Sequence, residues 1–316
     1  MKYSKCFWIR KLQKCVGKRK GEYGMKKKKF TVDKMTFVAF TIIPLILYTF
    51  FYFISVSCGI YYSLTDWNGL NREYNFVGIA NYIALSKNVF MWRSLWRTLL
   101  YACMLVVCVT VLSLIIAIVL NSVKKCRVFV KSVFFFPAML GSVAVALIWD
   151  QMFYQLLPAV GKMMGVNLQT PLADPSTAIF GVLFVNVWQA VAMPTIILLA
   201  GLQSIPDDLY ESAMIDGASR WQNFRYITLP FLVPTMTVNM VLNLKAGITT
   251  FDYAFALTGG GPNRATEFIG LMIYNDGFKD SNFAVANAKA VVLALIIAIL
   301  SFIQIRQSQK HEINEG

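Results

Sequence analysis

The feature that most constrains this chain is a series of apolar runs long enough to cross a lipid bilayer. The first run has no charged residue between Met35 and Thr65. A helix needs about 20 apolar residues to span the hydrocarbon core, and within lipid only helices and closed barrels satisfy all backbone polar groups. Charged residues make up only 15% of the chain, against about 25% in soluble domains. We therefore expect an all-α membrane protein.

Six segments are long and apolar enough to be membrane spans. Pro44, Pro137 and Pro194 fall inside them, where neighbouring helices can satisfy the carbonyls that a proline frees. Lys289 lies near the start of the last segment, where its long side chain can snorkel to the interface. We expect one membrane domain over residues 35–305, with spans at about 35–62, 97–121, 132–153, 178–201, 230–250 and 287–305.

The distribution of Lys and Arg predicts which loops are cytoplasmic. With the N-terminus inside, the inner segments carry 21 of the 30 basic residues and the outer segments carry 7. Because cytoplasmic loops are enriched in Lys and Arg, we expect a cell-membrane protein with a cytoplasmic arm at 1–34 and a cytoplasmic tail at 306–316. The basic arm precedes an apolar run, which favours a membrane-adjacent segment over a nucleic-acid partner. The string MKKKKFTVDKM from Met25 is itself a plausible start, which gives the hypothesis that residues 1–24 are not translated.

Residues that usually carry catalysis or bind metals are sparse. The six cysteines are scattered singly and the sole histidine is His311, so neither a zinc site nor histidine chemistry is expected. The phosphate-binding string GxxxxGK[ST] is absent. TGGGPNR, from Thr258, is Gly-rich but lacks the Lys-Ser/Thr ending, and we expect either an inert turn or a docking turn on the outer face. The chain should bind no cofactor and catalyse no reaction.

One polar insert, residues 204–230, interrupts the apolar pattern between the fourth and fifth spans. Its sequence is SIPDDLYESAMIDGASRWQNFRYITLP. Ser204 or Asp207 can cap a first short helix, and the acidic first turn suits the positive end of a helix dipole. Gly217 permits a turn that a side chain would hinder, and a second short helix with aromatic residues follows. Two short helices with exposed apolar residues suit another protein's groove, although an elbow lying on lipid headgroups would show the same pattern.

This insert resembles the EAA loop of binding-protein-dependent ABC importer permeases, whose pattern is Glu-Ala-Ala, three residues, Gly, nine residues, Ile-x-Leu-Pro. Ser212 replaces the middle Ala. The resemblance implies a cytoplasmic coupling helix that docks on an ATP-binding subunit, in a permease of MetI-like fold. The positions that we expect to carry coupling are Glu211, Ala213, Asp216, Gly217, Ile227 and Pro230.

Two further stretches resemble maltose-type carbohydrate permeases. They are FVNVWQAVAMPTIILLAGLQSIPDDLYE, from Phe184, and FDYAFALTGGGPNRATEFIGLMIYNDGF, from Phe251. The chain departs from the maltose subunit in having six expected spans rather than eight. The family implies that the chain works beside a second, related permease, two ATP-binding subunits that hold ATP and Mg, and an extracellular solute-binding lipoprotein, with a sugar as substrate.

Polar side chains within the spans are candidates for substrate contact, because such groups are costly in lipid. Asn239, Asn243, Gly247 and Thr250 recur on one stripe of a helix,. They suit either sugar hydroxyls or interhelical hydrogen bonds. By resemblance, the maltose-type site maps to Ala190, Met193, Asn243, Ala246, Gly247 and Thr250. The expected substrate-binding set is Asn186, Trp188, Gln189, Asn243, Lys245, Gly247, Thr250 and Phe251.

Lys245 is the one charge well inside an expected span. It could neutralise an acidic sugar such as a uronate, or it could pair with Asp150 or Asp252.

Taken with the family resemblance, the sequence predicts the non-catalytic permease subunit of an ATP-driven sugar importer. The alternative is a stand-alone secondary transporter or channel for a small polar solute.

Overall fold

The computed structural model describes residues 36–123 and 127–314, which fold into helices joined by loops. Within them, the backbone pairs in β geometry only at an isolated bridge between Thr65 and Phe76. The basic arm at 1–34, and with it the hypothesis about residues 1–24, lies outside the described residues. The expectation of an all-α fold is confirmed.

The chain divides into two compact units, with the boundary between Tyr61 and Tyr62. The first unit contains all but the last residue of the first apolar helix, Thr36–Tyr62, whose apolar window buries none of its residues. A π-helical turn, η1 (Thr49–Phe53), precedes its last segment, α2 (Ile54–Tyr62). A helix that is apolar all round and unburied within its own chain needs lipid or another chain to cover it.

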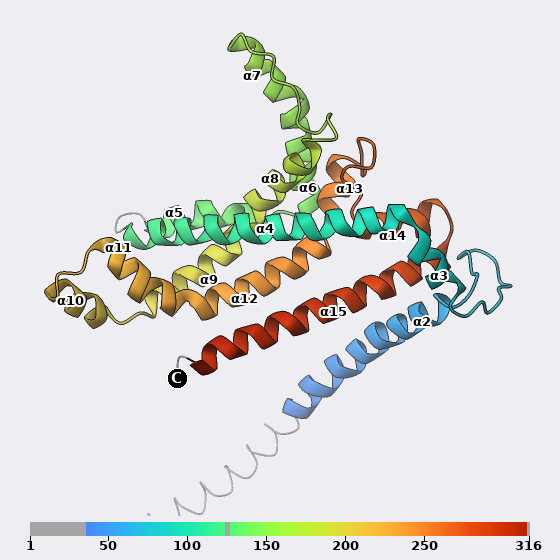
Figure 1. Ribbon diagram of the computed structural model, residues 1–316, viewed down its shortest axis with the longest axis horizontal. Helices are drawn as coiled ribbons and strands as arrows, with labels where there is room; N and C mark the ends of the chain where they lie inside the picture. The colour runs from blue at the N-terminus through green and yellow to red at the C-terminus, as the bar shows by residue number, and fades with distance from the viewer. Residues whose placement is uncertain (1–35, 124–126, 315–316) are drawn as a thin grey trace, which may run out of the picture. The chain divides into compact units, whose positions relative to one another are not determined.

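The second unit contains the remaining helices (Figure 1). Three of them are long, and the others are short or interrupted. In chain order they are α3 (Ala80–Lys87), α4 (Val89–Ser122), α5 (Arg127–Phe135), η2 (Phe136–Met139), α6 (Ser142–Gln151), η3 (Met152–Leu156), α7 (Leu157–Met163), α8 (Ala178–Ala190), α9 (Ala192–Gln203), α10 (Asp207–Ile215), α11 (Arg220–Asn223), η4 (Phe224–Thr228), α12 (Leu229–Ile248), α13 (Asp252–Leu257), α14 (Ile269–Tyr274), η5 (Asn275–Lys279) and α15 (Phe283–Asn314).

Five described helices are long and apolar enough to cross a membrane, and α8 with α9 forms a sixth candidate that is bent by 44°. The five are Thr36–Tyr62, Val89–Ser122, Ser142–Met163, Arg220–Ile248 and Phe283–Gln304. The fourth expected span is therefore a bent pair. The last helix continues to Asn314, so the expected tail at 306–316 begins as helix.

The segment expected to be the third span, 132–153, is broken in the middle. α5 ends at Phe135, a 3-10 turn holds Pro137, and α6 restarts at Ser142. Pro137 lacks an N–H and its ring crowds the preceding turn, which accounts for the break. α5 packs on α4 and α9, whereas α6 packs on α13 and α8. The two halves of this segment therefore contact different parts of the unit.

The core of the second unit lies where α4, α9 and α12 meet. Gly247 of α12 lies so close to α4 that a Cβ there would stand 2.7 Å from the Cα of Ala102. Small residues that let helices approach closely are typical of membrane helix contacts, where dispersion replaces the hydrophobic effect. α10 and α11 lie at one end of this core, and α14 and α3 lie at the other (Figure 1).

Lys289 does not snorkel to the interface as expected. Its side chain is only 3% exposed and forms an ion pair with Asp276, which belongs to η5. Asp276, which follows α14, thus provides the counter-charge for Lys289 in the first turns of α15. Pairing offsets part of the cost of burying the ammonium group.

Candidate functional site

The insert at 204–230, called the elbow below, folds into two short helices with a turn between them. α10 starts after Pro206, whose extended backbone makes it the N-cap without a side-chain bond. Asp207 and Asp208 occupy the first turn, where the helix dipole favours negative charge. Ser204 does not cap this helix, because its hydroxyl donates to the carbonyl of Gly201 at 2.8 Å.

Gly217 makes the turn between the two helices possible. Its φ is +77°, a left-handed conformation that side chains disfavour. The Ala218 N–H donates to the Ala213 carbonyl at 2.9 Å, and the Gly217 N–H donates to Met214 at 3.1 Å. This pattern is a glycine C-cap that satisfies the last carbonyls of α10. Ser219 and Gln222 then form a reciprocal capping box that starts α11,.

The elbow has an attached side and an open side. Leu209, Tyr210 and Ile227 pack against the apolar cluster formed by α4, α9 and α12. Tyr210 and Thr228 also share a hydrogen bond of 2.9 Å between their hydroxyl groups. The open side carries large apolar side chains that nothing covers within the described residues. These are Met214, Ile215, Trp221 and Tyr226, between 62% and 86% exposed.

The structure brings the expected coupling residues together on this elbow. Glu211, Asp216 and Gly217 are exposed, whereas Ala213, Ile227 and Pro230 are partly buried. Ile227 packs inward on the cluster of α4, α9 and α12, whereas Trp221 is 69% exposed. Met214 and Ile215 are the most exposed apolar residues of α10, and neither is among the expected coupling residues. Asp216, next to Ile215, was the signal in the sequence that could have predicted this exposure. A charged residue at a helix end keeps that end in water, so an apolar neighbour there stays uncovered.

The expected asparagine stripe of α12 faces the inside of this chain. Asn239 and Asn243 are 1% and 7% exposed. The Asn243 amide donates to the Asn239 carbonyl at 2.8 Å, and the Asn239 amide donates to Pro194 of α9 at 3.4 Å. The Thr250 hydroxyl donates to Ala246 at 2.9 Å. In this conformation, Asn239 links α12 to α9, Asn243 and Thr250 bond to carbonyls of their own helix, and Gly247 packs on α4 rather than on open space.

The polar residues of α8 also form hydrogen bonds within the chain. The Asn186 amide donates to the hydroxyl of Tyr101 at 2.8 Å. The Gln189 amide donates to the Leu140 carbonyl at 2.6 Å, and its oxygen accepts from Tyr253 at 2.7 Å. Gln189 thus joins the broken third span to α13. These contacts connect four segments through two buried side chains.

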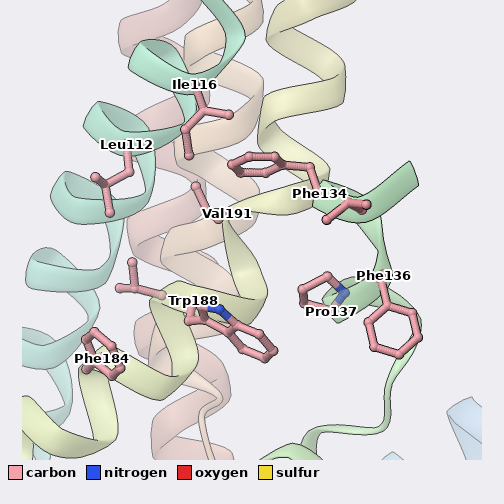
Figure 2. A pocket seen from close by; sticks show the side chains of 10 residues that line it. Leu112, Ile116, Phe134, Phe136, Pro137, Phe184, Trp188 and Val191 are labelled. Atoms are coloured by element: carbon pink, nitrogen blue, oxygen red, sulfur yellow. The ribbon is translucent and has the colours of Figure 1, made fainter. Parts of the chain in front are cut away.

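Trp188 points away from this polar set. It lies 38% exposed in an apolar groove of about 600 Å³ between α4, α5, η2 and α8. Figure 2 shows its indole beside Phe184, with Pro137 and Phe136 across the groove. The groove is lined by apolar side chains, namely Leu112, Ile116, Val133, Phe134, Phe136, Pro137, Phe184, Val187, Trp188 and Val191. Such a lining suits an apolar group better than the hydroxyls of a sugar.

The exposed face of α12 carries polar groups of its own. Lys245, Ala246 and Thr249 are exposed. Neither Asp150 nor Asp252 forms an ion pair with Lys245 within the described residues. Asp252 instead accepts a hydrogen bond from the Ser142 hydroxyl. Thr249 was not predicted from the sequence, although its place one turn after Lys245 could have found it. Phe251, partly buried, stacks on Phe255 with centroids 5.2 Å apart.

The Gly-rich turn is tightly held. The Arg97 guanidinium donates to the Arg264 carbonyl at 2.6 Å, and Ser94 donates to the carbonyl of Glu267. Arg264 pairs with Glu267 at 3.6 Å and lies over the ring of Phe90. Asn263 and Arg264 both have positive φ. Three or more potential metal ligands do not gather anywhere in residues 36–123 and 127–314.

Comparison with known proteins places these features in a family. Residues 109–309 match the family described as the binding-protein-dependent transport system inner membrane component. The chain is 44% identical over 276 residues to the multiple sugar-binding transport system permease of Streptococcus mutans, covering 87% of this chain and 95% of that protein. It is 34% identical to the probable starch degradation products permease of Thermoanaerobacterium thermosulfurigenes, covering 88% of this chain and 94% of that protein.

A solved structure shares the fold. The neighbour is a chain of a bacterial ABC transporter involved in the import of alginate, with a TM-score of 0.76 and 21% sequence identity. The match covers 88% of this chain and 97% of that one. The chain therefore belongs to the family of binding-protein-dependent transport system inner membrane components, and it is a multi-pass permease of the ABC importer type.

Proposed function

We propose that this chain is the permease subunit of an ATP-driven importer of a sugar or oligosaccharide. Its partners would be a second, related permease, two ATP-binding subunits and an extracellular solute-binding lipoprotein. Both ends of the chain and the elbow would be cytoplasmic, in keeping with the excess of Lys and Arg there,. ATP hydrolysis belongs to the partner subunits. The names of the two relatives above support a sugar as substrate class.

The observation that carries this proposal is the open side of the elbow. Ile215 is 86% exposed, and Trp221 and Tyr226 are 69% and 74% exposed. Uncovered apolar groups on a polar segment mark an interaction surface. Aromatic side chains are the usual anchors of protein interfaces. Closure of the ATP-binding subunits would push on this surface and bias the spans between inward-facing and outward-facing states.

We assign the predicted substrate residues two roles. Asn186 and Gln189 bond to other segments of the chain, and they would shape the substrate path by holding its helices. Asn243 and Thr250 bond to carbonyls of their own helix. Gly247 sets the spacing of α12 and α4. Trp188 would contact an apolar group in its groove. Lys245 and Phe251 remain for direct contact with the substrate.

Reconstitution tests the proposal against the stand-alone alternative. Both permeases are placed in proteoliposomes with the binding protein, with and without the ATP-binding subunits. We expect uptake of labelled sugar only when ATP and the ATP-binding subunits are both present. Concentrative uptake by the permeases alone would mean a secondary transporter, and passive equilibration would mean a channel.

A matched pair of variants tests the docking surface. Ile215→Asp should weaken binding of the ATP-binding subunit by about tenfold, the loss typical of one buried interface residue. Ile215 makes little contact within the chain, so the fold should persist. Leu70→Asp is the control, because Leu70 is 75% exposed in the loop between α2 and α3. Equal retention of the ATP-binding subunit by wild type and both variants would contradict the proposed surface.

A further inference from the structure

The exposed face of α12 is a regular stripe that ends in polar residues. At 3.6 residues per turn, Phe231, Val238, Leu242, Lys245 and Thr249 fall on one side of the helix, and all five are exposed. The asparagine stripe lies roughly a third of a turn around the helix and is buried. The side of α12 that is open to a ligand in this conformation is therefore the side that carries Lys245.

Lys245 lies within the apolar layer. Gly247, two residues further on, packs against Ala102 of α4, which is followed by an apolar stretch to Leu120. Cα–Cβ bonds in a helix tilt toward its N-terminus, so the Lys245 side chain starts toward the middle of the layer rather than toward the nearer surface. To reach the nearer membrane surface, the Lys245 side chain would have to bend back against the direction of its Cα–Cβ bond.

No carboxylate of the described residues lies within ion-pair distance of Lys245. The contrast with Lys289 is direct, because that lysine is buried and paired with Asp276. A charged group inside a membrane faces water or a counter-charge rather than lipid. Because Phe231, Val238 and Leu242 of the same face are apolar, the need for water or a counter-charge falls on the end of the helix at Lys245, whose ammonium group is available for an anion from outside this chain.

The neighbours of Lys245 suit a sugar that carries an acidic group. Ala246 leaves room beside the ammonium group. The Thr249 hydroxyl donates its proton to the Lys245 carbonyl at 2.9 Å, so its oxygen lone pairs can accept a hydrogen bond from a ligand. A Lys ammonium group binds carboxylate or phosphate through charge-assisted hydrogen bonds. An ammonium group and a hydroxyl acceptor together match one anionic oxygen and one neighbouring sugar hydroxyl.

We propose that Lys245 is a specificity-determining residue that binds the carboxylate of an acidic sugar as it passes along the exposed face of α12. The inference rests on the proposed function, because it names the substrate class of that importer. It assigns the anion to the ligand rather than to a carboxylate of the second permease.

The test compares two sugars that differ at one group. The complete transporter, with its own binding protein, is given digalacturonate or the same disaccharide with both carboxylates reduced to primary alcohols. The binding-protein affinity for each sugar is measured separately, and uptake is measured at saturating loaded binding protein. Wild type should import digalacturonate. Lys245→Met should lower that rate by about tenfold or more and leave import of the reduced sugar unchanged.

Three further variants complete the test. Lys245→Arg should keep most digalacturonate uptake, and Lys245→Glu should lower it below the level of Lys245→Met. Lys279→Met is the control, because Lys279 is an exposed cation of η5 outside the α12 face. Membrane levels and ATP-binding-subunit retention confirm assembly of each variant.

Several results would overturn the inference. Unchanged digalacturonate uptake in Lys245→Met would do so, as would failure of wild type to import digalacturonate. An equal loss for both sugars would place the counter-charge on the second permease instead. ATP-dependent import of the reduced sugar in any of these cases would leave the proposed function standing, whereas import of neither sugar would count against both.

Discussion

The two ends of α12 are built in opposite ways. Beyond its last residue lies a segment, residues 250–284, that we call the cap. Its backbone N–H groups bond to other parts of the chain: Ile269 donates to the Thr98 hydroxyl at 2.9 Å, and Ala284 donates to the Trp67 carbonyl at 2.9 Å. Before its first residue lies the elbow, which leaves large apolar groups uncovered. The cap bonds its backbone and its Asp276 carboxylate to other segments of this chain, whereas the elbow leaves an open side on which we propose that a partner docks.

This difference separates stability from coupling. Substitutions in the cap should unfold the chain because its polar groups are buried and mutually dependent. Substitutions on the open side of the elbow should leave the fold intact and remove the response to ATP. Each of the following predictions either challenges that separation or measures its size.

The largest effect is expected for Asp276→Asn in the cap. Lys289 would keep its charge at 3% exposure without a counter-charge, which costs about 3–5 kcal/mol in comparable buried pairs. Thermal unfolding of the purified chain in detergent measures the loss. The double variant Asp276→Asn with Lys289→Met should recover most of it. If the single variant unfolds at the wild-type temperature, the cap does not depend on this pair.

Gly247→Val should come next, because it overfills the contact of α12 with α4. A Cβ there would meet the Cα of Ala102 at 2.7 Å, and overpacking of this kind costs about 1–3 kcal/mol. The unfolding temperature should fall accordingly. Ala246→Val on the exposed side of the same turn is the control and should change it little. Equal effects of the two substitutions would mean that α12 is not seated on α4 as described.

Gly217→Val addresses the elbow. Nothing lies within 4 Å of the position that its Cβ would take, yet φ is +77°. The strain of a left-handed residue is about 1–2 kcal/mol, which is small beside the expected loss of ATP-driven uptake. Gly217→Asn should retain more uptake, because asparagine tolerates this conformation. Uptake measured beside the unfolding temperature tells whether the turn serves coupling or folding.

Ser219→Ala should have a smaller effect, limited to the second elbow helix. The substitution removes half of the capping box with Gln222, and caps of this kind contribute about 1 kcal/mol. Amide hydrogen exchange at Gln222 should accelerate, while exchange in α12 stays constant. Ser219→Asp should restore protection. A uniform acceleration along α12 would show that the elbow and the span unfold together.

The smallest effect concerns pH and the loop that contains the isolated bridge. The Asn75 backbone N–H donates to Asp66 at 2.6 Å, and this bond holds the pKa of the exposed Asp66 carboxyl below its ordinary value. A lowered folded-state pKa stabilises the loop above the ordinary aspartate pKa, and this contribution is lost as pH falls through the lowered value. Hydrogen exchange at Asn75 should show this dependence in wild type. Asp66→Asn should abolish it.

The sequence was sufficient to predict the helical class, the apolar segments and the position of the elbow turn. Long apolar runs and a left-handed glycine are local features, so they can be read without the fold. Boundaries were less accurate: α4 begins at Val89 rather than at 97, because a helix continues past the lipid wherever its side chains find partners. The roles of Asn239 and Asn243 could not be decided, since periodicity marks a shared face but not what lies opposite it.

Lys289 and Gln189 show why the rest required the structure. The partner of Lys289 is Asp276, which reaches it only because the chain turns back after η5. Gln189 bonds to Leu140 and Tyr253, which are 49 and 64 residues away. Pairings of this kind depend on the three-dimensional arrangement of the helices. A single sequence contains no local signal for them.

The interruption at Phe136–Gly141 has a mechanical consequence. A continuous helix acts as a rod, so that a push at one tip displaces the other by the same amount. A segment made of two pieces, here α5 and the candidate span Ser142–Met163, transmits force less directly, and the joint is tethered to α8 through the Leu140 carbonyl. Displacement of α5 is then taken up as rotation at the joint, so that α5 changes its tilt while the helix that starts at Ser142 keeps its contact with α13.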